Sequence, residues 1–506
     1  MFKRLVSFRF SVIVITIFFL VSTSWAYENS VFSLHFVDEE DNMIVGKYLT
    51  QGEKLYSDIF SNHQPLSYVA SAVLQEVTDQ NTIFQLIKRH REAVILWSFL
   101  WYMLLAWKFR WRIFPFIVCY ELTKHFLLGN LFLAESIAVY PLTYVVLLLF
   151  DHQKITKKEL ISIFFCCSLL FFLLSALWPS IVFLIFVFYL KSRKYIELSR
   201  FVVSLLIGFL PITVIIFLFS SVTEYVTQTL FINLFYYIPY VSDKNPFSLL
   251  LSFISPFVPF FSLQTSPISW ILRFVTFIFI ICCYQLVNKR EYKVLAFQII
   301  LLGLLNIRYI EPGVQYYSGF HLLPWFGVFL TLSTSGYRSA WKKRLSIVWI
   351  SLIASIILIC SYFAMNSLFK DRNIQDDFFI NYSTFNDYAL TIQGLIASGD
   401  TVFAAAIEPL VYFGVDKSFR TKYTYYFNFM DKVPSIHTEV TFLFEKDPPE
   451  IFFCECYGAP YLQKYLNKYH QVIRNGAESF LYLSKEKMTR LTTEQKKLAT
   501  FYGFEL

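Results

Sequence analysis

Four consecutive acids occupy residues 38–41, shortly after the first apolar run of the chain. They open the segment HFVDEEDNMIVGKYLTQGEKLYSDIFSNHQPL, residues 35–66, which ends in an HQPL turn. A carboxylate held at the boundary between water and lipid can take the proton of a hydroxyl group, and desolvation there would help by raising its pKa. The alternative is a solvated helix N-terminus, where carboxylates interact favourably with the helix dipole.

Three further polar side chains lie at the ends of later apolar runs: Glu135, Arg308 and His321. Placing an ionisable group in a membrane segment costs free energy, so such a residue is a candidate for a functional role. For Glu135 the alternative is a structural partner for Lys124 or His125. For Arg308 the alternative is a contact with a lipid headgroup.

The composition indicates a membrane protein. Of 506 residues, 56% are hydrophobic and only 16% are charged, whereas about 25% charged residues are usual in soluble proteins. Apolar runs of about twenty residues recur, and in hydrocarbon such runs must be helical because each backbone polar group needs a partner. The net charge of +8 does not indicate nucleic-acid binding, since the basic residues form short clusters between apolar runs.

Eleven apolar segments are predicted to span the membrane. The alternative number is thirteen, because several segments are short and the apolar stretch 248–263 has no second span to pair with. The eleven segments are 10–26, 92–107, 111–128, 131–150, 159–177, 179–190, 201–220, 268–287, 294–307, 321–335 and 345–366. Twenty basic residues lie in alternate connections, and only Lys244 and Arg308 lie in short loops of the opposite parity. By the positive-inside rule the N-terminus is cytoplasmic, unless the first segment is a cleaved signal peptide.

Two larger hydrophilic regions are therefore predicted outside the cytoplasm: a first loop, residues 27–91, and a tail, residues 367–506. The remainder, residues 1–366, forms the membrane domain. The first loop is predicted to hold one helix that starts at the acids and stops near Gly52, and a second over 66–77, both lying flat at the membrane surface.

The tail is predicted to be a small α/β domain. Strands are expected at 401–407, 450–456 and 479–485, a helix at 461–470, and the alternation suggests a partly parallel sheet. Cys454 and Cys456 would face the same way on a strand, but no matching ligand pair predicts a zinc site. The sequence has no Walker loop, glycine-rich dinucleotide turn or nucleophile elbow, so it does not indicate ATP-driven or serine-hydrolase chemistry.

The ordered pattern DEE, GKYL and GEKLYSDIFSNHQPLSY resembles the first outer loop of GT-C glycosyltransferases of the protein O-mannosyltransferase and aminoarabinose-transferase type. Those enzymes carry an Asp-Glu pair after the first span, here Asp38-Glu39, and later a (His/Lys)-Pro-Pro-Leu turn. His63 stands at the first position of that turn, and Gln64 replaces its first proline. The resemblance is strongest over residues 30–70.

This resemblance implies a GT-C-like membrane enzyme that transfers a hexose or pentose from a polyprenyl-phosphate donor to a lipid, glycan or protein acceptor of the cell envelope. Asp38 would be the catalytic base, and the acids after it, Glu39, Glu40 and Asp41, would support it, so that replacing Asp41 by Asn should have little effect. His63, Arg308 and His321 would bind the donor phosphate, and Glu135 would place the acceptor or a divalent metal ion, the one cofactor left open. The predicted location is a bacterial inner membrane.

A transporter or flippase of lipid-linked glycans is the alternative from another class. It would need acids and bases distributed along a path at the membrane midplane and, ideally, repeated halves. The ionisable residues here gather in one long loop, and no matching halves are found.

Overall fold

The computed structural model describes residues 13–17, 19–21, 31–78, 80–151, 155–241, 251–261, 267–307, 316–334, 374–405 and 408–506. The chain divides into two compact units. The helical unit comprises Met1–Val31, Arg91–Ile215 and Lys244–Asn373, and the mixed unit comprises Phe32–His90, Ile216–Asp243 and Ile374–Leu506.

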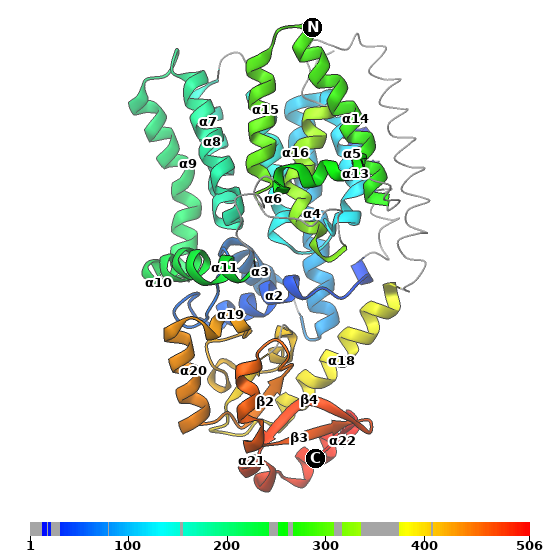
Figure 1. Cartoon of the computed structure of the whole chain (residues 1–506), viewed down its shortest axis with the longest axis vertical. Helices are drawn as coiled ribbons and strands as arrows, with labels where there is room; N and C mark the ends of the chain where they lie inside the picture. Colours follow the sequence, from blue (N-terminus) through cyan, green and yellow to red (C-terminus); the bar gives the residue numbers. More distant parts are fainter. Residues whose placement is uncertain are drawn as a thin grey trace. The chain divides into compact units, whose positions relative to one another are not determined.

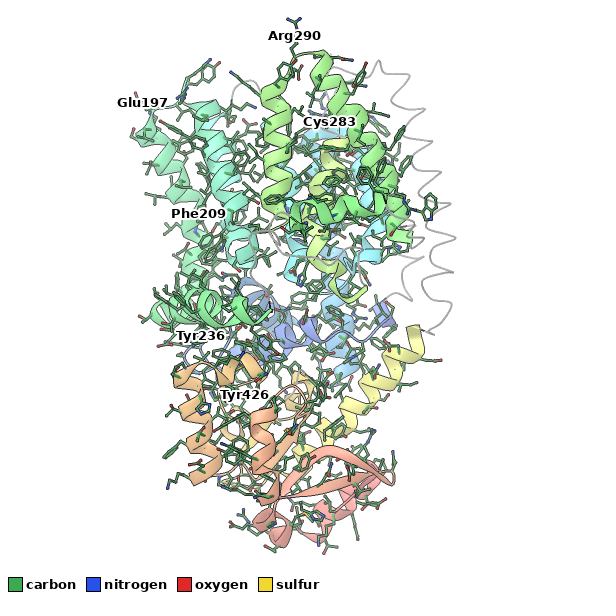
Figure 2. All side chains as sticks on the ribbon, viewed as in Figure 1. Glu197, Phe209, Tyr236, Cys283, Arg290 and Tyr426 are labelled. Carbon is green, nitrogen blue, oxygen red and sulfur yellow. A yellow bond between two sulfur atoms is a disulfide. The ribbon has the colours of Figure 1, made fainter. Side chains whose placement is uncertain are left out.

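The helical unit contains apolar helices of 10 to 27 residues. They are α5 (Phe114–Thr123), α6 (Ala134–Asp151), α7 (Lys157–Leu173), α8 (Trp178–Ser192), α14 (Pro267–Asn288), α15 (Tyr292–Leu305) and α16 (Leu323–Thr334), together with most of α4 (Ile83–Phe109) and α9 (Leu198–Phe219). Helices α6 and α16 approach closely because Gly327 has no side chain: a Cβ there would lie 2.4 Å from a methyl group of Val139. Arg290 (Figure 2) occupies the turn between α14 and α15 with a positive φ of 59°.

Four helices among the described residues are long and apolar enough to cross a membrane: Ile83–Arg112, Ser175–Ser192, Leu198–Phe219 and Ile268–Asn288. They coincide with the segments predicted at 92–107, 179–190, 201–220 and 268–287. The segments predicted at 131–150 and 294–307 form shorter apolar helices, Ala134–Phe150 and Tyr292–Leu305. The described part of the chain is thus mainly helical, and four of its helices have the length and apolar composition of membrane spans, while the predicted total of 11–13 spans stays a prediction.

The segment predicted as one helix at 111–128 is interrupted. Helix α5 ends at Thr123, a 3-10 turn follows over Lys124–Leu127, and Leu128 then adopts a left-handed conformation with φ 60°. The segment predicted at 345–366 lies outside the described residues, and so does much of the one at 10–26.

The mixed unit holds the two helices predicted for the first loop. Helix α2 covers Val37–Thr50 and α3 covers Leu66–Val77, and Gly52 ends the turn after α2 with a positive φ of 84°. The two helices pack tightly, since a Cβ on Gly46 would lie 2.3 Å from the Ser71 hydroxyl oxygen. Their position flat on a membrane stays a prediction.

A five-stranded sheet lies in the same unit, in the order β1-β2-β4-β3-β5. The strands are β1 (Val402–Ala405), β2 (Ile451–Cys454), β3 (Tyr469–Arg474), β4 (Ala477–Ser484) and β5 (Phe504–Glu505). Figure 1 shows β2, β4 and β3 side by side. The three predicted strands are therefore confirmed as β1, β2 and β4.

Only β1 and β2 run parallel, and the other strand pairs are antiparallel. Strand β3 is not among the predicted strands. A 3-10 helix (Pro460–Lys468) occupies most of the predicted helix 461–470, and the chain extends from Tyr469. The two-residue turn Asn475-Gly476, with φ values of 51° and 77°, makes β3 and β4 a hairpin, which is necessarily antiparallel.

Helices surround the sheet. They are α18 (Ile374–Leu395), α19 (Asn428–Asp431), α20 (Pro434–Lys446), α21 (Lys485–Arg490) and α22 (Thr493–Phe501). A further stretch consists of α10 (Val222–Val226), the π-helix Thr227–Tyr237 and α11 (Ile238–Val241). The core is strongly aromatic: Tyr426 is buried in it, and Tyr236 of the π-helix packs against the same cluster (Figure 2).

Candidate functional site

Helix α2 gives its four consecutive acids different environments. Asp38 is exposed, whereas Glu39 and Glu40 are fully buried and Asp41 is nearly so. Successive residues on a helix point about 100° apart, so one face of the first turn points outward and the remainder points into the mixed unit. The acidic run is therefore not a uniformly solvated helix cap.

Glu40 belongs to a buried cluster with His35 and Glu408. The imidazole Nε2 of His35 lies 3.0 Å from Oε1 of Glu40 and 3.3 Å from Oε2 of Glu408. Burial would lower the pKa of His35, but the two carboxylates raise it to about 11. Burial raises the pKa of Glu40 to about 8, although the attraction of His35 opposes the shift.

The imidazole of His35 is held from two sides. Its ring stacks on Phe385 at 5.3 Å and meets Tyr382 edge-on at 5.0 Å, both on α18. Its backbone N–H donates to Asp377 Oδ2 at 3.2 Å. Because ring, backbone and carboxylate contacts all constrain this residue, the position of Nε2 is well defined.

Glu408 reaches the cluster through the parallel part of the sheet. The chain arrives at Glu408 soon after β1 ends, and Glu455 follows the end of the adjacent parallel strand β2. Parallel strands end at the same edge, so both acids come to one place. Burial raises the pKa of Glu455, and the negative charge of Glu408 raises it further.

A second network links Asp41 to the HQPL turn. The Tyr68 hydroxyl donates to Asp41 Oδ2 at 2.5 Å, and His63 Nδ1 lies 3.2 Å from the same hydroxyl. His63 Nδ1 is also 3.6 Å from the Asp41 carboxylate, while 55% of the His63 side chain is exposed. The buried Asp41 carboxylate and the buried Tyr68 phenol thus both lie close to the imidazole of His63, which is exposed to solvent.

The turn is fixed by polar contacts with the stretch that contains the π-helix. The amide oxygen of Gln64 accepts a hydrogen bond from the Tyr225 hydroxyl at 3.0 Å. Asn62 and Asn233 bond through both side chains and through the Asn62 carbonyl. Gln64 stands where the turn of the resembled family has its first proline, and its hydrogen bond with Tyr225 helps to fix the turn.

The helical unit brings two of the predicted residues together. His321 Nδ1 lies 3.3 Å from Oε1 of Glu135. Glu135 is buried, and about a third of the His321 side chain is exposed. Nearby in sequence, Lys124 pairs with Glu121 at 2.8 Å, with both side chains almost fully buried.

The predicted site residues thus fall into groups. Asp38, Glu39 and His63 lie in the mixed unit, and Glu135 and His321 lie in the helical unit. Arg308 lies outside the described residues. The roles assigned to these residues stay predictions.

His35 and Glu408 are not among the predicted site residues, and Glu40 is predicted only as a supporting acid. His35 lies only five positions before Glu40, which was a usable signal, but nothing local marks Glu408. A disulfide that was not predicted joins Cys454 and Cys456 at the end of β2.

Comparison of the chain with protein-family models, curated proteins and solved structures finds no match in any of the three. The resemblance over residues 30–70 therefore stays a prediction.

Proposed function

We propose that this protein is a membrane glycosyltransferase that uses a polyprenyl-phosphate sugar as donor. The observation that carries the proposal is the arrangement of Asp41, Tyr68 and the exposed His63, which lies in the segment that resembles GT-C enzymes. When protonated, an imidazole backed by a carboxylate is a suitable ligand for a phosphate leaving group.

Asp38 is proposed as the catalytic base. Its side chain belongs to the one exposed residue among the four acids, so an acceptor hydroxyl from solvent can reach it. A base acts mainly while the proton leaves, so its contribution is larger in the transition state than in substrate binding. The pair of Glu135 and His321 is proposed to position the acceptor or a metal ion, and Arg308 to bind the donor phosphate.

The first experiment asks whether a donor is present at all. The protein is purified in mild detergent, and the bound lipids are extracted and identified by mass spectrometry. A co-purified polyprenyl phosphate, with or without a sugar, supports the proposal. The purified protein is then supplied with a panel of polyprenyl-phosphate sugars, and release of free polyprenyl phosphate is measured.

Replacing Asp38 by Asn tests the proposed base directly. The substitution keeps the shape of the side chain but removes its basicity, so turnover should fall by roughly 10²–10⁴-fold while donor affinity stays unchanged. Asp58→Asn is the matched control, because Asp58 is an exposed acid of the same loop. Turnover of Asp38→Asn close to that of Asp58→Asn would eliminate Asp38 as the base.

The pair Glu121–Lys124 favours a second candidate, a transporter or flippase of lipid-linked glycans. A buried ion pair in a predicted membrane segment is typical of a substrate or proton pathway. Transport of a fluorescent lipid-linked glycan across liposomes containing the protein, without release of free polyprenyl phosphate, would support this function instead.

A further inference from the structure

The cluster of His35, Glu40 and Glu408 is built like a ligand set. One ligand atom from each residue lies within 4.8 Å of the other two. Two of these separations, from His35 Nε2 to an oxygen of each acid, are 3.0 and 3.3 Å. Two ligands of a tetrahedral Zn²⁺ ion, each about 2.0–2.2 Å from the metal, lie roughly 3.3–3.6 Å apart, so the second separation already fits and the first would have to lengthen slightly.

The contacts within the cluster are close without forming aligned hydrogen bonds. Among the described residues, His35 Nε2, both carboxylate oxygens of Glu40 and Oε2 of Glu408 have no hydrogen-bond partner. The Glu40 side chain is fully buried. Buried carboxylate oxygens normally have hydrogen-bond partners, and leaving them without any is costly. Lone pairs that converge in this way are suited to a cation.

Negative charge exceeds positive charge around the cluster. Glu39 and Glu455 lie close enough to influence its electrostatics, in addition to the two acids that contact His35. A metal ion would displace the proton that His35 shares with the two acids, and with the imidazole neutral the three ligands carry a charge of −2, which a divalent ion would balance. A nitrogen donor beside carboxylates favours Zn²⁺ over Ca²⁺ or Mg²⁺, which prefer oxygen alone.

We propose that His35 Nε2 and the carboxylates of Glu40 and Glu408 bind one divalent transition-metal ion of the Zn²⁺ class. The ion fastens the start of α2 to the segment that leads into the 3-10 helix Pro409–Tyr412. The separation between the two carboxylate oxygens is at most 4.8 Å, so it would have to shorten by roughly 1.4 Å or less. The site is independent of the sugar-transfer proposal, because its ligands differ from the residues proposed there.

Metal binding is tested on the full chain in detergent at pH 7.5. The protein is treated with EDTA, freed of the chelator and titrated with Zn²⁺, Ca²⁺ or Mg²⁺ by calorimetry, and bound metal is counted by elemental mass spectrometry. We expect one equivalent of Zn²⁺ at this site and a higher thermal unfolding midpoint with Zn²⁺ than without it. Tighter binding of Ca²⁺ or Mg²⁺ than of Zn²⁺ would overturn the assignment.

Two variants locate the site. Glu40→Gln and Glu408→Gln should each weaken Zn²⁺ binding by more than roughly 100-fold, because losing even an outer partner of a metal ligand costs about 10–100-fold. Glu408 is partly exposed, so its variant serves if Glu40→Gln does not fold.

His437→Asn is the matched control, since His437 pairs with Asp431 at 2.7 Å in the same unit but belongs to no three-residue ligand group among the described residues. Its affinity for Zn²⁺ should equal that of the unmodified protein. If the unmodified protein binds no Zn²⁺, or if both glutamine variants bind Zn²⁺ as tightly as the unmodified protein does, the cluster is an ion-pair network without a metal.

Discussion

Removing the hydroxyl group of Tyr68 tests the network behind the HQPL turn. Tyr68 is fully buried and donates to Asp41 Oδ2 at 2.5 Å, and Asp41 is itself only 8% exposed. A hydrogen bond to a charged group contributes about 1.5–3 kcal/mol, and a buried carboxylate that loses its donor remains poorly solvated. Tyr68→Phe should therefore lower the free energy of unfolding of the mixed unit by about 1.5–3 kcal/mol.

The assay is thermal unfolding in detergent at pH 7.5, followed by intrinsic fluorescence. In a unit of this size 1 kcal/mol corresponds to roughly 2–4 °C, so the midpoint should fall by roughly 3–12 °C. Tyr457→Phe is the matched control: Tyr457 is exposed and donates to Glu455 at 3.0 Å. Water can replace the hydroxyl of the exposed Tyr457 as the donor to Glu455, so the control should change the midpoint by about 2 °C or less.

A double-mutant cycle separates the bond from other effects of the substitution. Asp41→Asn and Tyr68→Phe share one interaction, so the loss in the double variant should be smaller than the sum of the single losses. Equal midpoints for Tyr68→Phe and the Tyr457→Phe control would refute the network, and so would strict additivity of the two substitutions.

Two further substitutions probe the mixed unit. Gly46→Ala should lower the free energy of unfolding, measured by thermal unfolding, by about 1–3 kcal/mol, because the new Cβ would lie 2.3 Å from the Ser71 hydroxyl. Gly458→Ala is the control, because its Cβ would meet nothing closer than 3.8 Å. Equal losses of stability in the two variants would contradict the close packing of α2 and α3. Bonds from the backbone and side chain of Ser418 lower the pKa of Asp416, so its stabilisation is present above its ordinary pKa of about 4 and is lost as the pH falls through the lower value. The midpoint of Asp416→Ala should accordingly lie below that of the unmodified protein at pH 7 and converge with it in acid; a gap that is constant across this range would contradict the assignment.

Local sequence signals predicted some elements well. Apolar spacing and the following Pro-Leu turn marked α2 and α3, and the structure confirms α3 over the predicted 66–77. Strand propensity found β1, β2 and β4. It missed β3, because spaced apolar residues in YLQKYLNKYH resemble a helix, and only the hairpin with β4 fixes where the chain becomes extended.

The environment of the acids could not be predicted in the same way. Their run of charge favours exposure, and the sequence analysis treated Asp41 as a supporting residue of little effect. The structure buries Glu39, Glu40 and Asp41 because distant residues supply their surroundings, as Thr424 does for Asp41 at 3.4 Å and Glu408 for the His35 cluster. No local pattern encodes a partner that lies hundreds of residues away.

The mixed unit consists of three separate stretches of the chain, so it cannot fold completely until the last stretch has been synthesised. His35 and Glu408 contact each other although 373 positions separate them, and a ribosome adds about 5–20 residues per second. Roughly 20–75 seconds therefore pass between the synthesis of the first and last members of the cluster. Throughout that interval water must solvate the imidazole of His35 and the acids of α2. The first loop therefore cannot reach its final fold until the tail has been synthesised.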